Sequence, residues 1–263
     1  MTSRPFLAVV QYDGGQFVGW QRQAAGRTVQ GELEAVLQRL TDRRTVVTGA
    51  GRTDTGVHAL GQGAGFLADD RWAEDVGGLH RALNALLPKD IWVERVSAMG
   101  PGFHPRKSAI ARRYRYLIGT DPAAHSPFRR RFEWALGGGR ALDAKALAMC
   151  AETVLGEHDF RGFAAAGQAK PHYRCRVALA EWAPRADGVG MTLTIEADRF
   201  LHHMVRFLVG TMVDVALGRR PASDFPHLLA ATDNRAASTP APPQGLYLVS
   251  VRYPPDLYAG ASP

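Results

Sequence analysis

The chain has 263 residues, and its 46% of hydrophobic residues are enough to build the core of one or two globular domains. The net charge is +7, with arginine and lysine in excess. An excess of positive charge favours a polyanionic partner, although a basic enzyme without such a partner would have the same net charge. Polar residues interrupt the longest apolar stretch, 200–217, which argues against a membrane span. Without a signal-peptide or lipidation pattern, a cytoplasmic protein is expected.

The thiols and histidines do not form a recognisable metal motif. Cys150 and Cys175 lie far apart in the sequence, so buried reduced residues are more plausible than a disulfide or a zinc site. The pair His202-His203 has no acidic or cysteine companion at ligand spacing. We therefore expect no metal site.

Hydrophobic periodicity predicts the elements of the first half. In chain order these are a strand over 6–12, a glycine-rich loop, a helix capped by Thr28, a strand over 45–48, a helix over 72–86, and strands over 91–96 and 108–118. In the last strand, alternation places Arg112, Tyr114 and Tyr116 on one face and Arg113 and Arg115 on the other.

The second half repeats this alternation less regularly. We expect a helix capped by Asp143, a hairpin of 174–182 and 191–197, a helix over 200–217, a short helix near 225–229, and a strand over 246–253. Strands in hairpins as well as crossovers indicate an α+β fold with mainly antiparallel sheets. The glycine run Gly137–Gly139 and nearby prolines and arginines predict two halves, 1–120 and 121–263.

The loop Gly51-Arg-Thr-Asp-Thr-Gly-Val-His58 is the most informative segment for chemistry. Its glycine spacing resembles a phosphate-binding loop, but Val57-His58 replaces the required Lys-Ser/Thr, so that interpretation fails. The glycines of 61–65 lack the spacing of a dinucleotide fingerprint and indicate a strand or turn. Asp54 on its own is compatible with an Asx-turn as well as with catalysis.

This loop resembles the active-site motif of the tRNA pseudouridine synthase A family, and other segments resemble further motifs of that family in the same order. They are 12–23, 28–30, 83–88, 103–104, 112–116, 158–160, 200–206 and 245–248. The resemblance implies an isomerase that turns uridine into pseudouridine without a cofactor. It further implies a homodimer that acts on the 3′ side of the anticodon stem and loop of tRNA.

By the same resemblance, Asp54 is the catalytic aspartate, which attacks the base or the sugar or removes a ribose proton. Arg206 is expected to pair with it across a central cleft, because a buried carboxylate needs a positive neighbour to stay ionised. Tyr114 is expected to stack on the uracil, whereas Tyr116 and His58 are interpreted as structural. The substrate-binding residues expected from the motifs and the basic segments are Arg52, Arg22, Phe17, Arg112 and Arg113, with Arg27 and the run Arg129–Arg131 as further backbone contacts.

The chain departs from the family pattern at Gly63, Gly65, Pro105, Lys107 and His202. These departures affect the expected loop shape and substrate range. None of them falls on Asp54, Tyr114 or Arg206. Three alternatives stay open: a non-catalytic RNA-binding or chaperone protein of the same fold, a pseudouridine synthase for another RNA site, and a hydrolase that uses Asp54 and His58. The hydrolase lacks a nucleophilic serine or cysteine motif.

Overall fold

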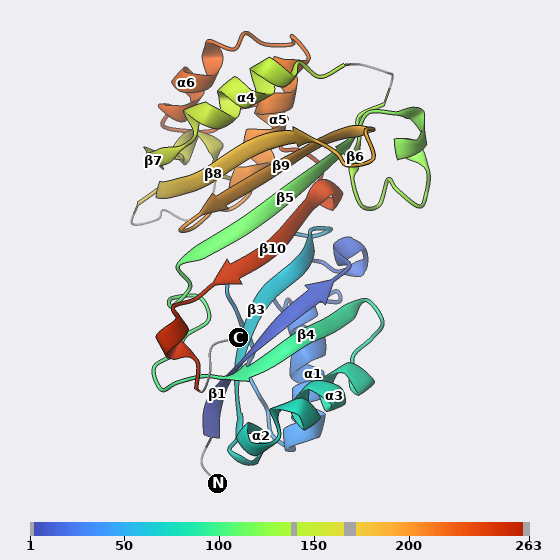
Figure 1. Cartoon of the computed structure of the whole chain (residues 1–263), viewed down its shortest axis with the longest axis vertical. Coiled ribbons are helices and arrows are strands. Elements are labelled where there is room, and N and C mark those ends of the chain that lie inside the picture. The colour runs from blue at the N-terminus through green and yellow to red at the C-terminus, as the bar shows by residue number, and fades with distance from the viewer. Residues whose placement is uncertain (1–2, 138–140, 166–171, 260–263) are drawn as a thin grey trace. The chain divides into compact units, whose positions relative to one another are not determined.

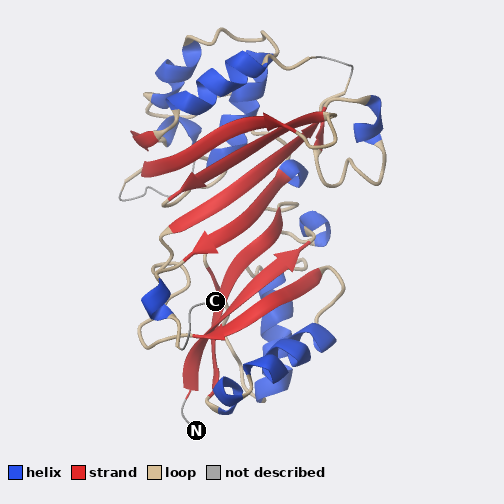
Figure 2. Ribbon diagram, in the orientation of Figure 1, coloured by secondary structure: helices blue, strands red, loops and turns tan. Residues whose placement is uncertain are grey.

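The computed structural model describes residues 3–137, 141–165 and 172–259, which divide into two compact units (Figures 1 and 2). The first unit is Met1–Ala111 with Leu248–Pro263, and the second is Arg112–Tyr247. Both contain helices packed on mainly antiparallel strands, so the predicted α+β class is confirmed.

The division differs from the expected boundary after residue 120 in two segments. Residues 112–119 belong to the second unit because they pair with its strand β9 (Gly190–Ala197). The C-terminal segment returns to the first unit, where β10 (Leu246–Arg252) is a neighbour of β3 (His58–Asp69). Strand pairing, which the local sequence does not encode, decides both assignments. Most of the predicted glycine run, residues 138 and 139, lies outside the described residues.

The first unit contains a sheet with the strand order β4-β1-β3-β10, and its helices lie in the segments that connect the strands (Figure 1). Its further elements are β1 (Ser3–Tyr12), α1 (Val29–Thr41), β2 (Thr48–Gly49), α2 (Arg71–Glu74), α3 (Val76–Leu86) and β4 (Ile91–Ala98). Thr28 caps α1 as predicted, since its hydroxyl accepts from the Gly31 N–H at 3.2 Å. Phe6, Leu37, Leu79 and Leu83 are among the buried side chains that join the helices to the sheet.

Two elements of this unit differ from the expectation. The predicted helix over 72–86 is divided into α2 and α3, because Asp75 leaves the helical conformation and its carboxylate accepts from the Gly78 N–H at 2.7 Å. An apolar periodicity cannot reveal such an internal cap. The predicted strand over 45–48 is reduced to the short β2, which pairs with β3 only at Thr48 and Gly49.

In the second unit, helices cover one face of a sheet with the order β5-β9-β8-β7 (Figure 2). Its remaining elements are β5 (Ala111–Gly119, whose first residue belongs to the first unit), β6 (Trp134–Ala135), α4 (Ala144–Thr153), β7 (Gly156–Asp159), β8 (Arg174–Pro184), α5 (Met204–Ala216) and α6 (Asp224–Leu229). Asp143 caps α4 as predicted, and Gly188 turns the β8–β9 hairpin with φ +73°. The core contains Leu147, Phe163 and Phe225.

Two smaller findings complete the fold. Cys150 and Cys175 are buried free thiols, as predicted. Among the described residues, none of the helices has the length and apolar character needed to cross a membrane.

Candidate active site

The loop that carries Asp54 connects β2 to β3 and alternates inward and outward side chains. Thr53 and Val57 are buried, Arg52 is exposed, and Asp54 is half-buried. The Val57 N–H donates to Asp54 O at 3.1 Å, and Gly56 has φ +79°. The aspartate therefore begins a tight hydrogen-bonded turn whose neighbouring side chains point into the core.

The loop after β1 supports this turn from the core side. The Tyr12 hydroxyl forms a buried hydrogen bond with Thr53 Oγ1 at 2.7 Å, and the backbone N–H of Trp20 donates to Thr53 O at 3.0 Å. Gln62 Nε2 donates to Gly51 O at 2.8 Å. Burial raises the pKa of Tyr12 to about 12 against the opposing hydrogen bonds of Thr53 and Gln62, so its hydroxyl stays protonated at neutral pH. The residue before the aspartate is thus held by both its side chain and its backbone.

Two glycines allow the loop after β1 to come this close. A Cβ atom on Gly14 would lie 2.1 Å from Val57 O, and a Cβ atom on Gly19 would lie 2.8 Å from Thr53 O. Gly19 also has φ +98°, a conformation that residues with a side chain disfavour. The glycines of the 12–23 motif are therefore required by contact with the Asp54 loop.

His58 belongs to the same contact. The Gly14 N–H donates to His58 Nδ1 at 3.0 Å, and Asp13 Oδ1 lies 3.3 Å from that nitrogen. A backbone N–H can donate only to an unprotonated nitrogen, so we assign the hydrogen bond to Gly14 and no ion pair to Asp13. The Asp13 carboxylate instead accepts from the Gly15 N–H at 2.9 Å. The prediction that His58 is a hydrogen-bonded structural residue is confirmed.

Two predicted substrate-binding arginines lie at the surface of the unit that contains Asp54. Arg52 donates from Nε to Gln21 Oε1 at 3.0 Å, and Arg22 Nη1 lies 3.3 Å from Glu34 Oε2 with 52% of its side chain exposed. Neither arrangement prevents a contact with phosphate. Their contacts with RNA stay predictions.

Phe17 requires a correction. Only 2% of the residue is exposed, and the guanidinium carbon of Arg27 lies 4.4 Å from its ring centroid. Arg27 is in turn bound by Asp90, with Nη2 2.9 Å from Oδ1, and by Glu32. Phe17 therefore fastens its loop to the core and is not positioned to stack on a base, while Arg27 is engaged in an internal ion-pair network. A sequence pattern does not distinguish these two uses of an aromatic residue in a loop.

Strand β5 presents the second group of predicted residues. Tyr116 is fully buried and donates to Pro242 O at 2.7 Å, which confirms its structural role. Tyr114 is 8% exposed and meets the Phe200 ring edge to face at 5.1 Å. Arg113 forms an ion pair with Glu196 at 2.8 Å. The stacking role of Tyr114 and the RNA contact of Arg113 stay predictions.

Arg112 lies on the same face of β5 as Tyr114. It is only 9% exposed, and its Nη1 donates to Asp198 O at 2.7 Å. Arginine is seldom buried unless its donors are satisfied, and here a carbonyl oxygen accepts one of them. Its contact with RNA stays a prediction.

Arg206 lies in the first turn of α5 and is half-buried. Its Nε donates to Ala241 O at 2.8 Å, and the Ala241 N–H returns a hydrogen bond to Arg206 O at 2.9 Å. The pKa of Tyr116 is raised well above its ordinary value by burial, and the Arg206 charge opposes this rise. Arg206 is therefore fixed on the helix by the segment 241–242. Its pairing with Asp54 stays a prediction.

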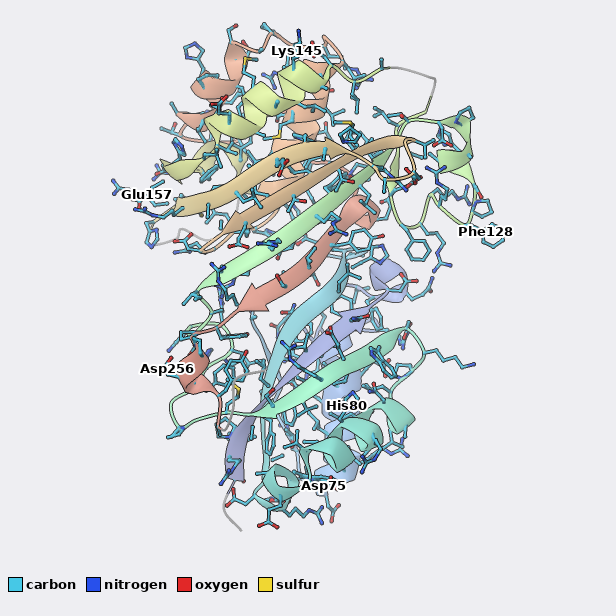
Figure 3. The ribbon with its side chains drawn as sticks, in the orientation of Figure 1. Asp75, His80, Phe128, Lys145, Glu157 and Asp256 are labelled. Carbon is cyan, nitrogen blue, oxygen red and sulfur yellow. The ribbon has the colours of Figure 1, made fainter. Side chains whose placement is uncertain are left out.

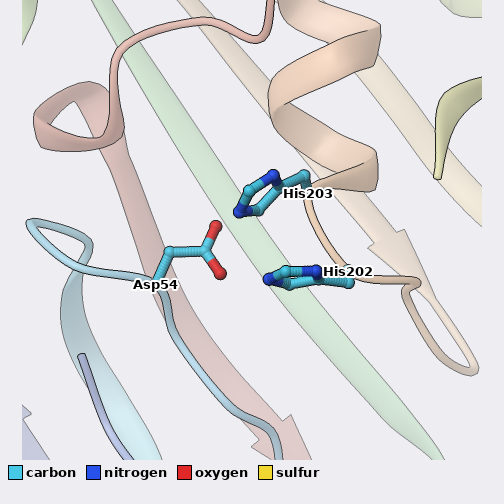
Figure 4. A group of neighbouring side chains, drawn as sticks. All are labelled: Asp54, His202 and His203. Atoms are coloured by element: carbon cyan, nitrogen blue, oxygen red, sulfur yellow. The ribbon is translucent and has the colours of Figure 1, made fainter. Parts of the chain in front are cut away.

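The helix α5 begins at Met204 and not near residue 200 as predicted, because His203 adopts φ +60°. This left-handed conformation is unfavourable for a residue other than glycine and interrupts the helical apolar pattern. Figure 4 shows the rings of His202 and His203 side by side, and their centroids lie 3.9 Å apart. The departure at His202 thus coincides with a strained backbone at the start of α5.

Three departures from the family pattern, at Gly63, Gly65 and Pro105, are explained by contacts around Pro105. A Cβ atom on Gly65 would lie 2.7 Å from Pro105 Cγ, so the small residue makes room for the proline. Likewise, a Cβ atom on Gly63 would lie 2.4 Å from the Tyr253 hydroxyl, which donates to Pro105 O at 2.9 Å. These changes are mutually compensating within the first unit. The structure does not explain the departure at Lys107.

Comparison with known proteins identifies the class to which this fold and site belong. The family model described as tRNA pseudouridine synthase matches residues 8–106 and 150–254. The matched segments contain Asp54 and Arg206, and Tyr114 falls between them.

Curated relatives named tRNA pseudouridine synthase A match almost the whole chain. The protein from Solidesulfovibrio magneticus is 43% identical over 248 residues, with 92% of this chain and 88% of the relative covered. Those from Myxococcus xanthus and Chloroflexus aurantiacus are 40% and 38% identical and cover 93% and 99% of this chain, with 90% and 92% of their own length covered. The chain belongs to the tRNA pseudouridine synthase family and is an isomerase.

The support beneath the Asp54 loop provides a first prediction. Thr53→Val removes the hydroxyl that contacts Tyr12 but keeps the shape of the side chain, so the aspartate is expected to lose its fixed position. We expect kcat to fall by about ten- to a hundredfold with little change in KM, because misplacement by about 1 Å is enough for such a loss. Single-turnover and steady-state kinetics on tRNA measure this change.

Matched variants separate positioning from a general loss of stability. Thr53→Ser keeps the hydroxyl and should retain most of the turnover. Tyr12→Phe combined with Thr53→Val should be no slower than either single variant, because both remove the same hydrogen bond. Independent, multiplicative losses in the double variant would contradict a shared role.

Proposed function

We propose that this chain converts uridine to pseudouridine on the 3′ side of the anticodon stem and loop of tRNA, with the Asp54 carboxylate as the catalytic group and no cofactor. The observation that carries the proposal is the half-buried Asp54 on a turn that Tyr12, Trp20 and Gln62 hold in place. Such support is expected for a group that must meet a reacting atom in one geometry. The printed names of the relatives supply the tRNA substrate.

The reaction is balanced without an external reagent. The bond between C1′ of the ribose and N1 of uracil breaks, the base turns, and a bond from C1′ to C5 forms while C5 loses its proton and N1 gains one. Asp54 supplies the carboxylate that this exchange requires. Arg206 is proposed to keep it ionised, and Tyr114 to stack on the uracil.

The remaining parts of the proposal concern the assembly. A homodimer in the cytoplasm is proposed, because the motifs resemble those of enzymes that bind each tRNA across two subunits. Arg22, Arg52 and Arg113 are proposed to contact the RNA backbone from the surface positions described above. These contacts offset the few kcal/mol that extruding a stacked base requires.

Loss of the C5 hydrogen gives a direct test. Purified protein is incubated with tRNA transcripts tritiated at C5 of uridine, in the presence of a chelator and without any cofactor. We expect tritium release from transcripts that carry uridines on the 3′ side of the anticodon arm, and no release when those positions are cytidine.

Two results would change the proposal. Release that persists in the cytidine-substituted transcripts would show a pseudouridine synthase for another RNA site. Binding of every transcript without release from any would favour an RNA-binding protein of the same fold.

A further inference from the structure

Phe128 is 87% exposed, more than any other large hydrophobic side chain in the described ranges. It lies in the loop 126–132 between β5 and β6, hereafter the Phe128 loop, and Figure 3 shows the side chain at the outer edge of that loop. Single exposed hydrophobic residues are common and have no meaning on their own. Whether the exposure of Phe128 indicates a binding surface depends on the residues around it.

The Phe128 loop is held by ion pairs beneath it. Arg129 binds both carboxylate oxygens of Asp121, at 2.8 and 2.9 Å, and its Nη2 lies 2.8 Å from Glu133 Oε1. Glu133 is buried and also binds Arg185. The pKa of Asp121 is lowered, chiefly by the hydrogen bond from Arg129. Arg129, expected from the sequence to contact RNA, is therefore an internal anchor, and this corrects that expectation.

The backbone of the loop is fixed as well. The N–H groups of Arg129 and Arg130 both donate to Ser126 O, at 3.0 and 2.9 Å, and the Tyr247 hydroxyl donates to Phe132 O at 2.6 Å. Phe128 lies within this hydrogen-bonded turn. Its exposure is thus imposed by an ordered frame and does not result from a loose segment.

Two further guanidinium groups lie on the outside of the same turn. Arg130 and Arg131 are exposed, and the guanidinium carbon of Arg131 lies 5.6 Å from the Phe132 ring centroid. An aromatic ring beside exposed guanidinium groups matches unpaired nucleic acid, in which a base offers a flat face and the neighbouring phosphates offer negative charge. A purely apolar partner offers no group that binds an exposed guanidinium.

We propose that the Phe128 loop is an RNA contact outside the Asp54 loop, in which Phe128 stacks on an unpaired base and Arg130 and Arg131 bind the adjacent phosphates. This inference rests on the proposed function for the presence of an RNA substrate. Beyond the proposed function, the inference states that the second unit binds an unpaired segment of that RNA.

The test measures binding without turnover. Tritium-free tRNA transcripts with cytidine at the target positions are titrated with wild-type protein and variants, and Kd is determined at several salt concentrations. Phe128→Ala is expected to raise Kd about tenfold, a loss typical for one stacked base, whereas Phe128→Trp retains binding. Arg130→Ala is expected to reduce the slope of log Kd against log salt by about one.

Controls keep the inference separate from stability, assembly and the proposed function. Met149→Ala, which removes another exposed side chain of this unit, should leave Kd unchanged. Sedimentation equilibrium and thermal melting are measured for every variant. Unchanged RNA binding by Phe128→Ala would overturn the inference, and so would a binding loss that appears only with dissociation of the oligomer, since the ring would then belong to an interface between copies. Weakened binding by Phe128→Ala would support it even if wild-type protein released no tritium.

Discussion

Replacing Asp54 with asparagine is expected to reduce pseudouridine formation by about four orders of magnitude while tRNA binding stays within about threefold of wild type. An amide can neither form the covalent bond nor accept the proton that the reaction requires. Because asparagine has nearly the same shape, and Thr53 and Val57 hold the turn on either side, the loop should keep its structure. Single-turnover tritium release and gel-shift titration measure the two quantities.

Two variants control for this experiment. Asp42→Asn removes the same charge from an exposed residue with φ +53°, a conformation that asparagine tolerates, and should be fully active. Asp54→Glu keeps the carboxylate but moves it outward by one methylene, and should retain a small fraction of the turnover. Activity of Asp54→Asn within tenfold of wild type would assign the chemistry to another group.

Replacing Gly14 with alanine is expected to damage both stability and turnover, although the change adds only one methyl group. The new Cβ atom would lie 2.1 Å from Val57 O, a backbone atom that cannot rotate away. The two loops must separate, which costs about 1–3 kcal/mol and lowers Tm by several degrees. Separation also removes the Gly14–His58 hydrogen bond, so kcat should fall by about tenfold or more. Thermal melting and tritium release test these effects.

Gly77→Ala is the matched control for this substitution. Gly77 is exposed in α3, where an added Cβ atom would meet the far end of Arg81 at 3.4 Å and the Asp75 carboxylate at 3.8 Å, both ordinary contact distances. Alanine is the better helix former by about 1 kcal/mol, so this variant should be as stable as wild type or more stable. Equal losses in Gly14→Ala and Gly77→Ala would show that the contact between the loops has no special importance.

Residues whose role depends on a partner elsewhere in the chain were the ones that sequence patterns misplaced or missed. Phe17 belongs to a segment that resembles an RNA-binding enzyme, yet it is buried. Nothing in the local sequence shows that Tyr12 and Gln62 contact the Asp54 loop, because this contact depends on the antiparallel pairing of β1 with β3. A single-sequence pattern reports periodicity and residue type and not the identity of a distant neighbour.

The sequence by itself determined the α+β class, the alternating faces of β5, the caps at Thr28 and Asp143, and the family to which the Asp54 loop belongs. The class, the faces and the caps depend on periodicity or on hydrogen bonds between residues a few positions apart, and the family depends on short motifs in a constant order. Only the tertiary structure decided the membership of 112–119 and 248–259, the break at Asp75, and which arginines are anchors. Strand pairing and burial bring together residues far apart in the chain, and the free energy of those contacts outweighs local preference.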